Sequence, residues 1–228
     1  MQRKRTIGIL GGMGPLATCD LYTKIIANTH ASTDQEHIHV IIDSNTAIPD
    51  RTAALLEGGE DPRPEMIRSA RMLEREGAAA IVMPCNTAHG FYDDIQSAVQ
   101  IPVLHMIRLT GEELKKRGIT KAGLMATTGT IRTGIYQQNI PDIELILPDL
   151  DEQAALMDMT YNGVKAGVKD YDGSKVQAAA ERMQALGAQV IILGCTELPL
   201  AKEMYHLQFD TIDPTLVLAQ AAVEFAEQ

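Results

Sequence analysis

The sequence predicts an α/β fold made of two similar domains, each built on a parallel sheet with helices on both faces. Short apolar or β-branched runs alternate with longer helical segments along the 228 residues, which is the pattern of parallel α/β proteins. Residues 77–85 also align without a gap with residues 187–195, and each segment has a Gly-Ala lead, an apolar run and a terminal cysteine. Residues 6–15 are echoed by residues 121–130, with glycines at matching places. These repeats predict an internal duplication with pseudo-twofold character.

The sequence pattern of the first half predicts four strands, at residues 6–10, 39–42, 79–83 and 102–105. Glycines follow the first strand, and Pro15 then suits the first turn of a helix that runs to about Asn28. A turn-rich link at residues 58–64 precedes a helix over about 64–76, and a further helix runs through Arg117. Strands that alternate with helices in this way favour parallel pairing.

The second half repeats this order. We expect its strands after Lys121 and at residues 143–147, 190–194 and 209–212, and helices at about 149–168 and 174–186. A last helix begins at Pro214, and we expect it to cross back to the first domain. The domains are therefore expected at residues 1–104 plus 213–228, with Cys85, and at residues 105–212, with Cys195.

Composition limits the classes of partner. The net charge of −10 does not favour a nucleic acid or an anionic membrane as a partner. No stretch approaches the roughly 20 apolar residues of a membrane span. The three cysteines form no CxxC pair, and the apolar run after the basic start is too short for a secretory signal, so we expect a cytoplasmic protein.

Cys85 and Cys195 each end a predicted strand and enter a polar turn. Two such thiols, placed about a cleft, suit the removal of a proton from one face of a carbon and its return on the other. The alternatives are a buried structural role, a redox pair, or a hydrolase in which His89 assists Cys85. A zinc site needs more soft ligands, so we expect no metal, and we interpret His37 and His39 as structural.

Proton abstraction beside a carboxylate needs donors aimed at the developing charge. The residues after each thiol and after the first strand of each half are suitable: Asn86, Thr87, Thr196, Met13, Gly14, Thr127 and Thr128. Arg51 and Lys165 are cations for a second carboxylate, although Arg51 could instead pair with Asp50 at the surface. Residues 12–17 fit a dinucleotide fingerprint only weakly, and a tight turn that lines a site is the favoured interpretation. We expect Cys19, inside the first helix, to be a small buried apolar side chain.

Five motifs together resemble the cofactor-independent aspartate racemases of the aspartate/glutamate racemase superfamily. They are Gly11-Gly12-Met13-Gly14-Pro15, Ile48-Pro49-Asp50-Arg51-Thr52, Met83-Pro84-Cys85-Asn86-Thr87-Ala88-His89, Gly163-Val164-Lys165-Ala166-Gly167 and Gly194-Cys195-Thr196-Glu197-Leu198. The resemblance spans nearly the whole chain. It implies two Rossmann-like or flavodoxin-like domains with the active site between them, no pyridoxal phosphate, no metal, and a homodimer.

The same resemblance implies roles for single residues. Cys85 and Cys195 would be the two acid/base thiols, acting on opposite faces of the α-carbon. Arg51 and Lys165 would grip the distal carboxylate, and Asn86, Thr87 and Thr196 would hold the α-carboxylate and amino group. Met13, Gly14 and Thr128 would complete the substrate site.

The implied reaction is interconversion of L- and D-aspartate, with glutamate as a further substrate. Some relatives replace the first thiol with threonine, whereas this sequence keeps both. Other relatives act on glutamate, hydantoins, maleate or malonates, so a glutamate or hydantoin racemase and a maleate isomerase are alternatives. A non-enzymatic alternative is an amino-acid-binding sensor on the same two-lobed plan.

Overall fold

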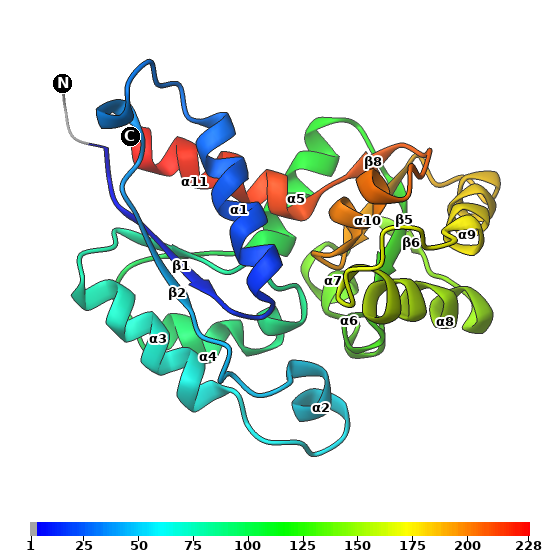
Figure 1. The fold of residues 1–228 in the computed structure, drawn as a ribbon, viewed down its shortest axis with the longest axis horizontal. Coiled ribbons are helices and arrows are strands. Elements are labelled where there is room, and N and C mark those ends of the chain that lie inside the picture. The colour runs from blue at the N-terminus through cyan, green and yellow to red at the C-terminus, as the bar shows by residue number, and fades with distance from the viewer. Residues whose placement is uncertain (1–3) are drawn as a thin grey trace. The chain divides into compact units, whose positions relative to one another are not determined.

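The computed structural model describes residues 4–228 and divides into two compact units (Figure 1). Unit 1 comprises the described residues up to Leu109 together with Thr215–Gln228, and unit 2 is Thr110–Pro214. Each unit contains one four-stranded sheet, and neighbouring strands in both sheets pair in parallel. The expected α/β class with two parallel sheets is confirmed. Within residues 4–228, no helix has the length and apolar character needed to cross a bilayer.

The sheet of unit 1 has the strand order β2-β1-β3-β4. Its strands are β1 (Ile7–Gly11), β2 (Val40–Ser44), β3 (Ala80–Val82) and β4 (Val103–Leu104). Its helices are α1 (Pro15–Asn28), η1 (Asp34–Glu36), α2 (Arg51–Leu56), α3 (Arg63–Arg75), η2 (Thr87–Phe91) and α4 (Tyr92–Ser97), followed by α5 (Met106–Lys116), which contains the unit boundary, and α11 (Pro214–Glu227).

The sheet of unit 2 has the order β6-β5-β7-β8, which repeats the order of unit 1 strand for strand. Its strands are β5 (Lys121–Ala126), β6 (Glu144–Ile146), β7 (Val190–Gly194) and β8 (Thr211–Ile212). Its helices are α6 (Thr128–Thr133), α7 (Ile135–Asn139), α8 (Leu150–Asp158), the π-helix η3 (Met159–Val164), α9 (Ser174–Ala185) and α10 (Leu198–Met204).

The duplication extends to backbone conformation. Gly77 and Gly187, which end the helices before the two thiol strands, have φ values of +94° and +97°. Their N–H groups donate to Glu74 O at 3.0 Å and to Gln184 O at 2.9 Å, which closes the last turn of each helix. Only glycine adopts this left-handed conformation without strain, so the same residue is required twice.

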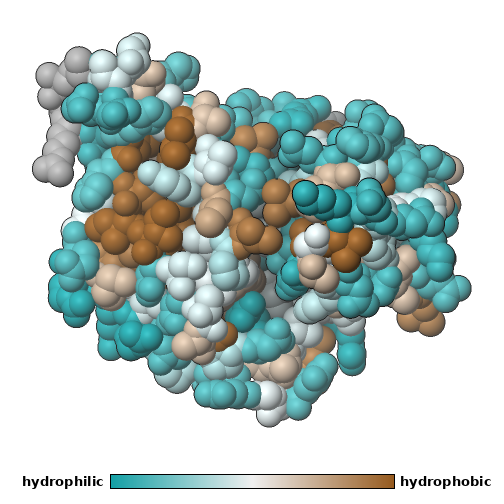
Figure 2. All heavy atoms as spheres, viewed as in Figure 1, coloured by the Kyte–Doolittle hydropathy of each residue, from teal (hydrophilic) through white to brown (hydrophobic). Residues whose placement is uncertain are grey.

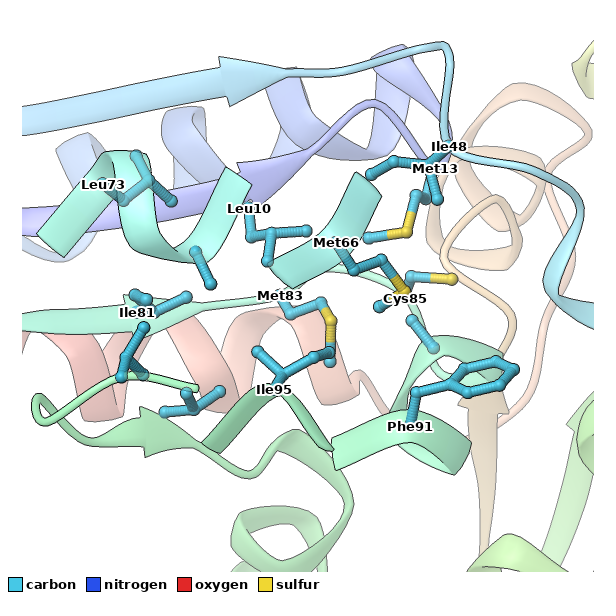
Figure 3. Packing of buried hydrophobic residues seen from close by; sticks show 14 of the residues in the cluster. Leu10, Met13, Ile48, Met66, Leu73, Ile81, Met83, Cys85, Phe91 and Ile95 are labelled. Atoms are coloured by element: carbon cyan, nitrogen blue, oxygen red, sulfur yellow. The ribbon is translucent and has the colours of Figure 1, made fainter. Parts of the chain in front are cut away.

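The core of unit 1 lies on both faces of its sheet. Ile7 and Ile9 pack with α1 and α11, while Leu10 packs on the opposite face with α3 and α4 (Figure 3). This split follows from the alternation of side chains along β1. Leu218 and Ala222 of α11 belong to the cluster of Ile7 and Ile9, so the last helix completes the core of unit 1.

The expectation that Cys19 is buried is wrong, because Cys19 is exposed. The buried side of α1 carries Leu21 and Ile25, four residues apart on one helical face. Cys19 lies on another face, together with Leu16 and Ile26, which are also exposed. Figure 2 shows hydrophobic atoms gathered over α1 and β2 of unit 1. The helix is apolar on both sides, so its sequence pattern does not reveal which side the core covers.

Candidate active site

Both strand-end cysteines lie where parallel strands end, which is where ligands bind in open α/β sheets. Cys85 follows β3 after a short turn, in which its N–H donates to Met83 O at 2.9 Å, and Cys195 directly follows β7. Cys85 is 7% exposed and Cys195 is 4% exposed. The polar residues after them, Asn86, Thr87, Thr196 and Glu197, are buried as well. Burial of so many polar groups costs free energy, which marks both turns as functional candidates.

The Cys85 thiol lies at the end of an apolar cluster. Its neighbours in the cluster include Met13, Met66 and Phe91, which Figure 3 shows around the end of β3. Met13 comes from the loop after β1, so the structure brings two of the predicted site residues into one cluster. The Cys85 turn therefore combines a thiol, apolar walls and the buried polar residues that follow it.

His89 fixes this turn through the backbone. Its Nδ1 donates to Cys85 O at 2.9 Å, and its Nε2 accepts from the Met106 N–H at 3.1 Å. This arrangement requires the neutral tautomer with the proton on Nδ1. Burial lowers the pKa of His89 to about 4, in agreement with that tautomer. Because both ring nitrogens are hydrogen-bonded to backbone groups, His89 does not act as a base on the Cys85 thiol. This counts against the hydrolase alternative.

Arg51 is the first residue of α2 and does not pair with Asp50. The Asp50 carboxylate instead caps the helix by accepting from Ala53 N at 2.8 Å. The Arg51 guanidinium donates to three backbone carbonyls: Ile48 at 3.2 Å, Pro49 at 2.9 Å and Met13 at 3.4 Å. The Arg51 Nε–H is buried and has no acceptor among the described residues. An anionic ligand would satisfy this buried cationic donor with a charge-assisted hydrogen bond.

The glycine loop after β1 is shaped by close packing. Gly12 has a φ of +89°, and a Cβ at this position would lie 2.3 Å from the backbone carbon of Asn45. The Gly12 N–H donates to Thr18 Oγ1 at 2.9 Å, and Gly14 precedes Pro15 at the start of α1. This packing accounts for Gly12 of the weak dinucleotide fingerprint, and Met13 of the same loop belongs to the cluster around Cys85.

The Cys195 thiol is held through its side chain. Its Sγ donates to Glu197 Oε2 at 3.0 Å, and Thr196 Oγ1 donates to the same oxygen at 3.3 Å. The other oxygen of this carboxylate, Oε1, lies 3.5 Å from Lys165 Nζ. Burial raises the pKa of Cys195 well above its usual value, and the negative charge of Glu197 raises it further. Cys195 is therefore a protonated thiol near neutral pH.

Lys165 follows the π-helix η3, a rare form that recurs at functional sites. Its ammonium lies 4.4 Å from the centre of the Tyr161 ring. Burial lowers the pKa of Lys165, but the Glu197 carboxylate, together with Tyr161 and Cys195, more than offsets this, so the pKa is raised and the lysine stays charged. Gly163 is closely packed in the same segment, because a Cβ there would lie 3.0 Å from the Tyr205 hydroxyl.

Thr128 is held at the end of β5. Its hydroxyl accepts from Gln153 Nε2 at 3.3 Å, and its N–H faces Met157 Sδ at 3.4 Å. The neighbouring Thr127 caps α6 by accepting from Thr130 N at 3.3 Å. Of these two threonines, Thr127 uses its hydroxyl as the helix cap and Thr128 does not.

Sequence reasoning assigned no role to Glu197, although it lies within one of the quoted motifs. The signal was available, because Glu197 is an acidic residue two positions after a strand-end thiol. Gln153 and the backbone contacts of His89 were also missed, since they connect residues from separate elements. Across residues 4–228, no group of three His, Cys, Asp or Glu side chains is placed to hold a metal ion.

The fold and the two thiol turns define a duplicated α/β protein with one buried cysteine at the same strand end in each half. The family model for Asp/Glu/Hydantoin racemase matches residues 10–222. The chain belongs to this racemase family, and the resemblance noted in its motifs is confirmed at that level.

Individual relatives agree with this assignment. The chain is 30% identical to the broad specificity amino-acid racemase RacX of Bacillus subtilis (strain 168), over 95% of this chain and 96% of the relative. Its structure resembles the Picrophilus torridus aspartate racemase with a TM-score of 0.87 and 30% identity, covering 98% of this chain and 94% of the other. It also resembles an aspartate racemase homologue from Pyrococcus horikoshii OT3, with a TM-score of 0.80, 27% identity and coverage of 99% and 100%.

Proposed function

We propose that the protein is a cofactor-independent amino-acid racemase that interconverts L- and D-aspartate, with Cys85 and Cys195 as its two acid/base groups. The observation that carries this proposal is the pair of buried thiols at equivalent strand ends, one of which is held protonated by its burial and by a neighbouring carboxylate. A reaction that removes a proton on one face and adds one on the other needs one base and one acid at the start. Binding alone needs neither.

In one direction, the Cys85 thiolate takes the α-proton, and the electron pair of the broken C–H bond moves into the substrate's α-carboxylate. The S–H proton of Cys195 then adds to the opposite face of the α-carbon and leaves Cys195 as thiolate. The reverse direction exchanges these roles, and no oxidant, reductant or further reactant is needed. We assign the stabilisation of the α-carboxylate and amino group to Asn86, Thr87 and Thr196.

An acidic side chain on the substrate is supported by the two cations. Arg51 has a buried N–H without an acceptor, which a second carboxylate would satisfy. Lys165 stays charged and partly exposed, so it is available as a second contact. Met13, Gly14 and Thr128 complete the proposed binding set. The similarity to an aspartate racemase favours aspartate, while the similarity to a broad specificity racemase makes glutamate and neutral amino acids the alternatives to test.

We also propose a cytoplasmic homodimer. The three cysteines are free thiols, which suits a reducing compartment. The exposed apolar side chains of α1 and β2, among them Leu16, Ile26 and Ile42, give unit 1 a surface that a second copy could cover.

Proton NMR in D₂O tests the proposed function. Purified protein without added cofactor should remove the α-proton signal of L-aspartate while D-aspartate accumulates, and L-glutamate and L-alanine serve as comparison substrates. The matched control is the Cys85→Ala/Cys195→Ala variant, which should do neither. Binding of aspartate with no α-proton exchange would contradict the proposal and favour the amino-acid sensor.

A further inference from the structure

One carboxylate in unit 2 joins a thiol to a cation. Glu197 presents Oε2 to the Cys195 thiol at 3.0 Å and Oε1 to the Lys165 ammonium at 3.5 Å. The carboxylate and the thiol are both buried, so solvent screens their contact poorly, whereas the Lys165 ammonium reaches the carboxylate from a partly exposed position. The state of one neighbour therefore affects the other through the charge of Glu197.

We propose that Lys165 controls the protonation of Cys195 through Glu197, so that the cation assigned to the substrate's side chain also sets the acid of the reaction. Lys165 is in this sense a positioning residue as well as a binding residue. This inference rests on the proposed function, since it assigns Cys195 to the reaction.

The direction of the effect follows from the charges. A carboxylate beside a thiol opposes thiolate formation, and a cation on that carboxylate weakens this opposition. While Lys165 contacts Glu197, the Cys195 thiol loses its proton more easily than it would beside an uncompensated carboxylate. A substrate carboxylate that draws Lys165 away leaves the charge of Glu197 uncompensated and holds the proton on Cys195. Acidic substrates would thus hold the proton on Cys195 more firmly than neutral substrates, which leave the contact between Lys165 and Glu197 in place.

Other titratable groups face this cluster from the surrounding elements. Tyr136 of α7 is fully buried, and burial raises its pKa so that it stays neutral. Asp213 acts on Tyr136, and Tyr161 lies under the Lys165 ammonium. Lys165 is the cation that acts on the Cys195 thiol among the described residues. Its removal therefore tests the connection directly.

The test measures the Cys195 thiol without turnover. Cys19→Ser and Cys85→Ser leave Cys195 as the only cysteine, and its alkylation by iodoacetamide is followed as a function of pH, with ultraviolet thiolate absorbance as a second measurement. In this background, Lys165→Met should move the midpoint to higher pH and slow alkylation at pH 8 by about tenfold, the effect of one pKa unit. Glu197→Gln should move the midpoint to lower pH.

Three further variants keep the test decisive. Lys165→Arg keeps the charge and should stay near the parent profile. Lys202→Met removes another lysine of unit 2 that lies over an aromatic ring, that of Phe209, and should change nothing. In the Glu197→Gln background, Lys165→Met should shift the midpoint less than it does when Glu197 is present, because the part of the coupling that passes through the carboxylate is lost.

The proposal is overturned if Lys165→Met leaves the midpoint unchanged, or if it shifts the midpoint equally with and without Glu197. These outcomes are independent of catalysis, because alkylation requires no substrate. The exchange of the α-proton by the wild-type protein tests the proposed function separately.

Discussion

The two thiol turns differ in what holds them, although the strands that carry them are equivalent. The Cys85 turn is fixed through its backbone, where His89 bridges Cys85 O and Met106 N. The Cys195 turn is fixed through its sulfur, which donates to Glu197. In the aligned repeats, Glu197 corresponds to Thr87. The duplication thus kept the position of the thiol and changed the residue two places later, which gives the two halves different resting chemistry.

Loss of either thiol should have the largest effect. Cys85→Ser and Cys195→Ser should each reduce racemisation by at least roughly 10³-fold, because a hydroxyl is far less acidic than a thiol. Each variant should still exchange the α-proton of one enantiomer, and the two variants should retain opposite enantiomers. Chiral chromatography and NMR in D₂O measure this, with thermal unfolding as the control for folding. Full racemisation by either variant would contradict the two-base assignment.

Removal of the Arg51 charge should reduce aspartate turnover selectively. Arg51→Leu should lower kcat/KM for aspartate about tenfold or more, since a charge-assisted hydrogen bond contributes roughly 1.5–3 kcal/mol, and should affect alanine much less. The matched control is Arg63→Leu, because Arg63 also opens a helix but is exposed and paired with Asp61 at 2.9 Å. Equal losses of kcat/KM for aspartate and alanine would contradict the proposed role of Arg51 in binding the substrate's second carboxylate.

Acidification should lower the stability of the folded protein through His89, which fixes the Cys85 turn. Its pKa is lowered from 6.5 to about 4, so the unfolded state binds more protons between these values and stability falls as pH falls through that window. Acidification from pH 7 to pH 4.5 should therefore lower the free energy of unfolding by about 2 kcal/mol through His89, because each pKa unit corresponds to 1.36 kcal/mol. His105, with a pKa of about 3, acts in the same direction.

Urea unfolding at the two pH values measures this effect. His89→Gln should lower stability at pH 7 but lose less than the wild type on acidification, because glutamine does not titrate. An equal loss in both proteins would show that carboxylates, and not the buried imidazole, dominate the acid response.

Substitution of the third cysteine, Cys19, should have the smallest effect. Cys19→Ser should change kcat/KM by less than about twofold and unfolding free energy by less than about 0.5 kcal/mol, as expected for an exposed position. The Cys19 thiol should also react with a disulfide reagent before Cys85 and Cys195, which are buried. Slow labelling of Cys19 would contradict its exposed position on α1.

The sequence alone predicted the features that occur twice or that require one particular residue type. The paired Gly77 and Gly187, with a cysteine eight positions after each, revealed the duplication and the thiol strands. Short helices such as α4 and α10 were missed, because they add too few apolar residues to show a period. The contact between Lys165 and Glu197 depends on the π-helix, whose altered winding no residue pattern predicts.

The placement of α11 has a consequence for biosynthesis. Unit 2 is one continuous segment, whereas unit 1 needs the last 14 residues of the chain as well as its first part, since these residues are Thr215–Gln228. Leu218 and Ala222 share a cluster with Ile7, so β1 leaves the ribosome about 200 residues before the helix that closes its core. During translation the nascent chain therefore carries an unfinished apolar surface until α11 has emerged, and unit 2 is able to fold first.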